Sequence, residues 1–155
     1  MRNNFIKIFL LSILTTIIIS CNNEKDIQTY DFSGTWKVIS FLNLEASTKI
    51  LKTENNTWSQ FNNGDNTISF TKSNSTTGLV SGRNVTNSFS GEFTSDSIGK
   101  ILISKLIWTE VNEPEWGILF HTISKAESYE IKNNILTIFY NEKKNCITLE
   151  RIGNE

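Results

Sequence analysis

Apolar and polar residues alternate in short segments along most of this 155-residue chain. In Thr67–Lys72, Ile68 and Phe70 fall on one face of an extended strand, and polar residues separate them. A period of two predicts strands that are buried on one face. Asn, Ser and Thr clusters separate the segments, and the chain contains a single Pro. The pattern therefore predicts antiparallel strands joined by polar turns.

Further segments of this kind lie on both sides of Thr67–Lys72, and they predict additional strands. They cover residues 32–44, 77–83, 88–94, 100–108, 127–132, 135–141 and 146–152. In the first segment, we expect Trp36 and Val38 on one face and Phe41 on the other. In the last segment, we expect Ile147 and Leu149 to share a face.

Three other stretches have patterns of their own. Residues 100–108 are almost continuously apolar, which predicts a strand covered on both faces. The pair Asn133-Asn134 separates two predicted strands, and Asn tolerates the positive φ of a tight hairpin turn. Residues 47–61 have no clean period, so we expect an irregular excursion that contains a short strand or turn.

One segment has the period of a helix instead. Asn112 is a candidate N-cap, Pro114 suits the first turn, and Glu115 completes a pair resembling a capping box. Four apolar residues then recur at helical spacing: Trp116, Leu119, Phe120 and Ile123. We expect this stripe to pack on the sheet. The fold class is therefore a β-rich α+β domain over residues 32–155, a small curved antiparallel sheet or partly open barrel with one packed helix.

Residues 1–20 have the pattern of a signal peptide, with basic Arg2 and Lys7 before an apolar run too short to span a membrane. The sequence Ile18-Ile19-Ser20-Cys21 resembles a bacterial lipobox. This resemblance implies cleavage before Cys21 and attachment of acyl chains such as palmitate to Cys21, which anchor a protein stably when two or more are present. An ordinary secretory signal beside an unrelated Cys21 is the alternative.

Several expectations about location follow from the lipobox. Residues 21–31 are polar and would form a tether between the lipid and the domain. The predicted partner of Cys21 is therefore the membrane, and the location is the cell envelope of a Gram-negative bacterium. Asn22 is not the Asp that retains such proteins in the inner membrane, which favours the outer membrane. Cys146 would be the only free thiol, which excludes an intramolecular disulfide.

Composition excludes several functional classes. The formal net charge is −1, so no basic surface for nucleic acid is expected. The chain has one His and two Cys, too few for a zinc finger or a disulfide-rich scaffold. We found no phosphate-binding loop, nucleophile elbow or metal-binding helix in the sequence. We therefore expect no cofactor and no metal, and we expect that the protein is not an enzyme.

The residue types that carry chemistry elsewhere have simpler interpretations here. We expect His121 at the edge of the helix rather than as a base, and Cys146 as a structural thiol. Three acidic residues near the helix start, Glu110, Glu113 and Glu115, are expected to complement the positive helix end rather than to act as a catalytic pair. Three candidate calcium ligands, Asn63, Asp65 and Asn66, are expected to form a turn, because the twelve-residue loop pattern is missing.

Three ordered stretches resemble the META domain, the HslJ-like family of small bacterial envelope proteins. They are Gly34-Thr35-Trp36-Lys37-Val38, Asn87-Ser88-Phe89-Ser90-Gly91-Glu92-Phe93, and the region from Trp108-Thr109 through Phe120 to Ser128-Tyr129 and the Leu136 hairpin. The family's Gly-Cys before the second motif is replaced by Val85-Thr86, so no thiol role is carried over. The resemblance implies a non-catalytic envelope lipoprotein with a binding or envelope-stress role.

A second resemblance leads to a different function. Gly34-Thr35-Trp36 also resembles the opening of lipocalin-like barrels, in which a late Arg packs on the Trp, and Arg151 is the candidate for that role. The alternative function is then a small-molecule carrier with an internal apolar cavity. A third hypothesis is an inhibitor of an envelope hydrolase that acts through a protein face.

Candidate surface sites follow from residues that the strand pattern leaves unplaced. Trp58 and Phe61 are large apolar side chains in the irregular segment, and they are the predicted interaction surface for an envelope protein or a small ligand. The alternative is that both cover an end of the barrel. Asp96-Ser97-Ile98 is similar to a site at which some Bacteroidetes envelope proteins are O-glycosylated, which makes Ser97 a candidate for that modification.

Overall fold

A computed structural model describes residues 31–153. The chain forms nine strands, one short α-helix and two 3-10 turns within these residues. In chain order they are β1 (Gly34–Asn43), β2 (Thr48–Ile50), η1 (Asn62–Gly64), β3 (Thr67–Lys72), β4 (Thr77–Arg83), β5 (Ser88–Ser95), β6 (Ile101–Trp108), α2 (Glu115–Phe120), η2 (His121–Lys125), β7 (Ser128–Lys132), β8 (Ile135–Tyr140) and β9 (Asn145–Arg151).

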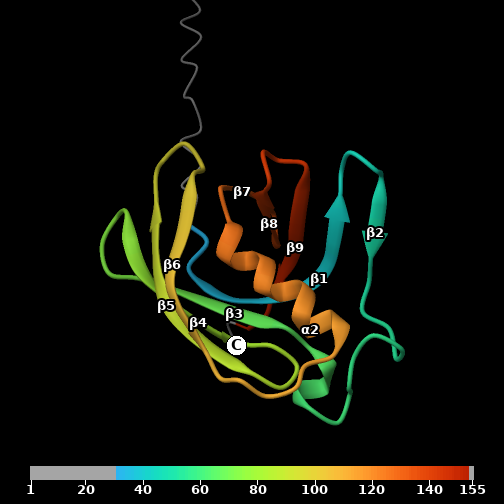
Figure 1. Cartoon of the computed structure of the whole chain (residues 1–155). Helices are drawn as coiled ribbons and strands as arrows, with labels where there is room; N and C mark the ends of the chain where they lie inside the picture. The colour runs from blue at the N-terminus through green and yellow to red at the C-terminus, as the bar shows by residue number, and fades with distance from the viewer. Residues whose placement is uncertain (1–30, 154–155) are drawn as a thin grey trace, which may run out of the picture.

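All strands belong to one antiparallel sheet, which curls into a half-barrel around α2 (Figure 1). The order is β6-β5-β4-β3-β1-β9-β8-β7, and β2 pairs with β1 outside this path. Strands β3 to β6 pair in chain order, as do β7 to β9, and β1 lies between β3 and β9, which is close to the order of an up-and-down barrel. The two edge strands approach each other at a single bridge between Lys100 and Ser128. The predicted fold class is confirmed.

The alternation of apolar and polar residues predicted several elements correctly. Ile68 and Phe70 are buried in β3, and Ile147 and Leu149 are buried in β9. The predicted hairpin joins β7 to β8, and Asn133 has the positive φ of 56° that this turn needs. The irregular segment contains one short strand, β2, whose residues are all exposed.

A bulge in β1 overturns one prediction about faces. The pairing of β1 with β9 shifts between Val38 and Ser40, so two residues of β1 oppose one residue of β9. The extra residue reverses the alternation, and Phe41 points into the core together with Trp36. We expected these two side chains on opposite faces because a strict period of two was assumed.

Strand β6 corrects a second prediction. It is covered on one face only, because Leu102 and Ile107 are 57 % and 73 % exposed. Its pairing with β5 also shifts, and Lys105 adopts a positive φ of 51° at that point. The continuous apolar run therefore belongs to an edge strand whose outer apolar side chains face solvent.

The helix begins later than predicted. α2 starts at Glu115, its N-cap position is Pro114, and no side chain caps it. The capping role expected of Asn112 and Glu115 was therefore wrong. Proline cannot donate a backbone hydrogen bond and its φ suits the start of a helix, so the helix begins directly after it. The apolar stripe is confirmed, because Trp116, Phe120 and Ile123 are all buried.

The space between the helix and the sheet is filled by large side chains. Phe32 forms edge contacts with Phe70 and Tyr129, with ring centroids 4.9 and 4.6 Å apart. Phe41 packs on Trp116 at 4.9 Å. The largest completely buried side chains are Trp36, Trp116, Phe32, Phe70, Phe93, Phe120, Ile68, Ile123, Leu136, Ile138, Ile147 and Leu149. Within residues 31–153, no helix is long and apolar enough to cross a bilayer.

Candidate functional site

One end of the half-barrel holds residue 31, and we call it the tether end. It consists of residues 31–34 and the β5–β6 hairpin, residues 95–101. Phe32 contacts Tyr129, and the backbone N–H of Tyr129 donates to the Gly99 carbonyl over 2.7 Å. Asp31, which we assigned to the tether, already contacts the domain. Its carboxylate accepts a bond from the Ser33 N–H and pairs with Lys72 at 3.2 Å, and these contacts lower its pKa to about 2.

Arg151 joins the last strand to the first near this end. Its guanidinium carbon lies 4.2 Å from the centre of the Trp36 ring, as the resemblance to lipocalin-like barrels implies. Its Nη1 donates to the Ser33 carbonyl over 2.6 Å, and Nη2 donates to the Asp31 carbonyl over 3.3 Å. Gly34 has a positive φ of 114°, a conformation that favours glycine, and a Cβ there would also lie 2.7 Å from Nη1. This arrangement fastens β9 to the start of the domain.

The opposite end of the half-barrel is formed by three loops, and we call it the far end. They are residues 51–66, 84–87 and 109–114. The loops are bonded to one another, since the Asn62 amide donates to the Asn84 carbonyl and the Asn87 amide to the Val111 carbonyl. Strands β5 and β6 connect the two ends, and eight residues of strand separate them by roughly 25 Å.

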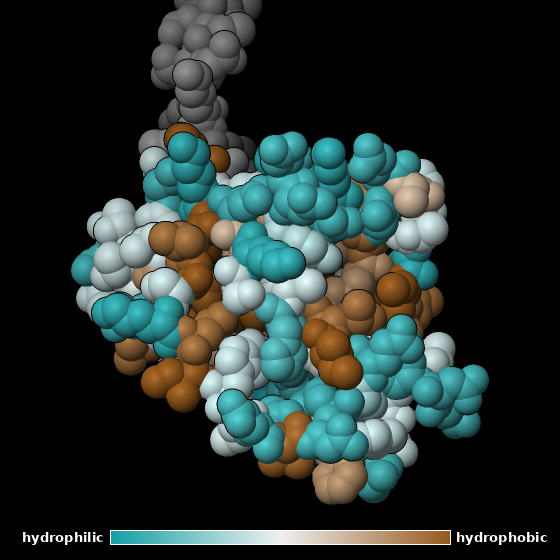
Figure 2. Space-filling model, in the orientation of Figure 1, coloured by the Kyte–Doolittle hydropathy of each residue, from teal (hydrophilic) through white to brown (hydrophobic). Residues whose placement is uncertain are grey.

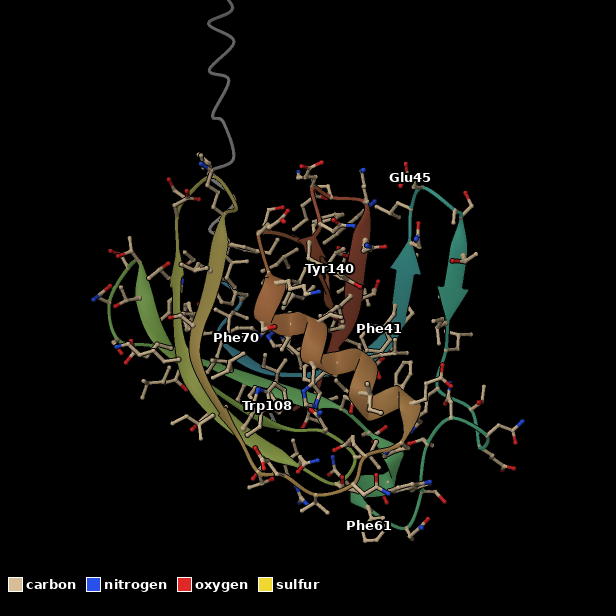
Figure 3. All side chains as sticks on the ribbon, viewed as in Figure 1. Phe41, Glu45, Phe61, Phe70, Trp108 and Tyr140 are labelled. Atoms are coloured by element: carbon tan, nitrogen blue, oxygen red, sulfur yellow. The ribbon has the colours of Figure 1, made fainter. Side chains whose placement is uncertain are left out.

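The two aromatic residues predicted as an interaction surface lie at the far end. Their ring centroids are 6.4 Å apart. Trp58 is half-buried and packs against the core, whereas Phe61 is 48 % exposed and points away from the domain at the bottom of Figure 3. The structure therefore gives the two residues different surroundings. Trp58 covers the barrel end, and Phe61 remains accessible.

A hydrogen-bond network at the far end, which sequence reasoning missed, is centred on Glu113. The Glu113 carboxylate accepts bonds from the backbone N–H groups of Thr86 and Asn87, both over 3.1 Å, and from the Thr86 hydroxyl over 2.7 Å. The Asn87 amide also donates to Glu113. Glu110 and Glu115 are exposed and do not join this network. Glu113 therefore holds the β4–β5 turn against the β6–α2 loop.

Asn87 connects the same two loops through its amide. It donates to the Val111 carbonyl and accepts from the Val111 N–H, each over 2.7 Å, and it accepts from the Thr109 hydroxyl over 3.0 Å. The asparagine of the second META-like motif is therefore a connector of loops here. The signal in the sequence was its position before Phe89, but its partners lie more than twenty residues away.

Two buried asparagines bind the helix. The Asn66 amide donates to the Trp116 carbonyl over 2.8 Å, and the Asn84 amide donates to the Gly117 carbonyl over 3.0 Å. Both residues are completely buried. Asp65 pairs with Lys52 at 2.5 Å, so the polar residues of this segment hold loops and helix in place. Within residues 31–153, no cluster of His, Cys, Asp and Glu could hold a metal ion.

The remaining candidates lie apart from one another. The His121 ring stacks on Trp108 with centroids 4.3 Å apart, at the edge of the helix as expected. Cys146 is a buried free thiol, and burial raises its pKa, which disfavours the reactive thiolate. Ser97 is exposed at the tip of the β5–β6 hairpin, and its glycosylation stays a prediction. Cys21 lies outside the described residues.

Two hollows are open to solvent on the outer side of the sheet. One has about 520 Å³ and lies over β4, β5 and β6, where Leu79 and Ile107 border the ion pair of Lys105 and Glu92. The other has about 450 Å³ and lies at the tether end beside Leu102. Figure 2 shows apolar surface over β6 and a polar upper rim.

Comparisons with known proteins give one informative result. No family model matches the chain, and no curated protein matches it. The fold matches a crystal structure at 1.00 Å resolution of a DUF4847 family protein from Bacteroides vulgatus ATCC 8482. The TM-score is 0.53 at 17 % sequence identity, and the match covers 79 % of this chain and 95 % of that one. At this identity, the match establishes that the two chains share a fold.

Proposed function

We propose that this chain is a non-catalytic envelope lipoprotein of the META-like type, anchored through Cys21, whose domain binds a partner protein at its far end. The observation that carries the proposal is the placement of Phe61. Its large apolar side chain is 48 % exposed, and it lies at the end of the half-barrel opposite residue 31. An anchor attached at the tether end keeps Phe61, at the opposite end, accessible to a partner protein.

The filled interior supports partner binding over transport of a small molecule. A carrier needs an internal cavity, and ligand cavities typically have about 300–1,000 Å³. Here aromatic side chains such as Phe32, Phe70 and Trp116 occupy the space between sheet and helix. The pairing of Arg151 with Trp36 favours a lipocalin-like architecture, but architecture does not determine function. An inhibitor of an envelope hydrolase is one kind of partner binder compatible with this proposal.

The catalytic alternative has little support from the acidic residues. Glu113 is fully engaged with Thr86 and Asn87, and it holds two loops together. Glu110 and Glu115 are exposed. A catalytic carboxylate pair needs two groups in one cleft with different environments, and these three residues do not form such a pair.

The test is co-purification of the native protein with Phe61→Ser as the variant. Phe61→Ser removes an exposed apolar group and leaves the core intact, whereas Trp58→Ala would also remove packing against the core. The matched control is Leu79→Ser, because Leu79 is 58 % exposed on the outer face of β4. We expect a partner that is recovered with the wild type and with Leu79→Ser but lost with Phe61→Ser. Equal recovery with all three proteins would reject the proposal.

A further inference from the structure

The tip of the β5–β6 hairpin lies beside the point where the chain enters the domain. Phe32 packs on Tyr129 at 4.6 Å, and the Tyr129 hydroxyl donates to the Asp96 carbonyl over 3.5 Å. The Tyr129 N–H donates to the Gly99 carbonyl on the same hairpin. Residue 31 and the hairpin are therefore held together through one side chain, and the hairpin tip lies at the top of Figure 1.

This tip presents apolar side chains to solvent. Ile98 is 75 % exposed, and Leu102, four residues later, is 57 % exposed. An open hollow of about 450 Å³ extends from Leu102 to Ala126 and is bordered by Lys100. Figure 2 shows brown surface at the tip of the hairpin above the otherwise polar upper rim. Apolar side chains with an adjacent lysine suit the boundary between lipid headgroups and acyl chains.

The tip is also rigid in its construction. One carboxylate oxygen of Asp96 accepts bonds from the N–H groups of Ile98, over 3.0 Å, and of Lys100, over 2.8 Å. Gly99 has the positive φ of 86° that closes the turn. The carboxylate of Glu127, which also borders the hollow, accepts a bond from the Glu142 N–H over 2.9 Å. The two acidic side chains that border the hollow thus accept backbone hydrogen bonds.

The length of the tether brings this end of the domain to the bilayer. Ten residues separate Cys21 from Asp31. A chain of that length spans at most roughly 35 Å even when it is fully extended. A short tether keeps the attached surface at an effective concentration on the order of millimolar. Even a weak contact between the tip and the bilayer is therefore populated.

We propose that the β5–β6 hairpin tip is a membrane-contact site, with Ile98 and Leu102 at the acyl boundary and Lys100 at the level of the lipid phosphates. The proposal rests on the anchor at Cys21 that is part of the proposed function. It adds a defined orientation, because the tip faces the bilayer and Phe61 at the far end faces away from it.

The experiment places an environment-sensitive dye on the hairpin of the full chain. The chain with Ile98→Cys is recovered from the envelope, labelled with a nitrobenzoxadiazole dye, and reconstituted in phosphatidylethanolamine–phosphatidylcholine vesicles with and without nitroxide-labelled lipid. Ile107→Cys is the matched control, because Ile107 is 73 % exposed and lies at the opposite end of β6. The unsubstituted chain is labelled in parallel, and buried Cys146 should take up no dye.

The proposal predicts a blue shift and strong nitroxide quenching at position 98, and neither at position 107. Equal or absent quenching at the two positions overturns the membrane-contact site and leaves the anchor standing. A mass spectrum of the same preparation reports the acyl chains on Cys21, and their absence overturns the anchor together with this inference. The same spectrum reports sugars on Ser97. A glycan there would hold the tip in water, so its presence overturns the membrane contact.

Discussion

The guanidinium of Arg151 lies over the ring of Trp36, its cross-strand partner, and so connects the last strand to the first. The same guanidinium donates to the Ser33 carbonyl, and the Trp36 ring N–H donates to the Phe32 carbonyl over 2.8 Å. The start of the domain is therefore bonded to β9 through side chains as well as through the β1–β9 ladder. The two edge strands of the half-barrel, by contrast, meet at a single bridge.

Arg151→Ala should destabilise the domain. It removes a cation–π contact and the hydrogen bonds to the carbonyls of Ser33 and Asp31, which together contribute about 1–3 kcal/mol to the free energy of unfolding. Urea unfolding of the variant measures this loss. The control is Arg83→Ala, because Arg83 is exposed at the end of β4 and should change stability by less than about 0.5 kcal/mol. Equal losses of unfolding free energy in the two variants would show that the contact with Trp36 does not stabilise the domain.

The Asp31 carboxylate should make stability sensitive to acid. Its pKa is lowered from 3.8 to about 2 by the bonds from Ser33 and the pairing with Lys72. A lowered pKa stabilises the folded state fully above pH 4, and this contribution is lost as the pH falls towards 2. Because the side chain is 60 % exposed, solvent screening limits the effect to about 0.5–1 kcal/mol. The free energy of unfolding of Asp31→Asn should therefore depend less steeply on pH in this window than that of the wild type. Equal pH dependence of the two proteins would contradict the assignment.

Asn87→Ala should be more damaging than any change at the exposed acids. It removes the amide that bonds Val111 and Glu113, and it leaves a partly buried carboxylate with fewer donors. We expect a loss of about 2–4 kcal/mol in the free energy of unfolding. Glu110→Gln is the control, because Glu110 is exposed and should change stability little. A loss below about 0.5 kcal/mol for Asn87→Ala would mean that the network does not hold the loops.

Aromatic rings lie over two glycines of β4 and restrict substitution there. Gly82 is paired with Phe89, and a Cβ at Gly82 would lie 2.6 Å from the ring and 2.2 Å from the Thr67 carbonyl oxygen. Gly82→Ala should therefore cost about 1–3 kcal/mol through overpacking. Ser81→Ala, one residue earlier on the exposed face, is the control. Thermal unfolding of both variants checks this, and equal melting temperatures would contradict it.

Local patterns predicted much of the fold, because they depend on neighbouring residues. The β7–β8 hairpin at Asn133, the buried pair Ile147 and Leu149, and the helical stripe from Trp116 to Ile123 all follow from spacing. The orientation of Phe41 did not follow, because one extra residue in β1 reverses the alternation. Alternation alone does not reveal where a bulge lies.

The candidate site was only partly predictable, for a related reason. Phe61 could be singled out because a large apolar residue stood in a segment without a period, and it is exposed. The role of Glu113 could not be found, because its partners Thr86 and Asn87 are distant in sequence. The exposed outer face of β6 was missed as well. A continuous apolar run is compatible with a strand covered on both faces and also with an edge strand whose outer apolar side chains face solvent.

The anchor at Cys21 is the central claim, because the orientation of the domain depends on it. Cells that express the chain are grown with labelled palmitate, and the protein is isolated from the envelope alongside a Cys21→Ala variant. We predict that the wild type carries the label and fractionates with membranes, and that Cys21→Ala carries none. Undiminished label on Cys21→Ala, or an unlabelled wild type, would contradict the account.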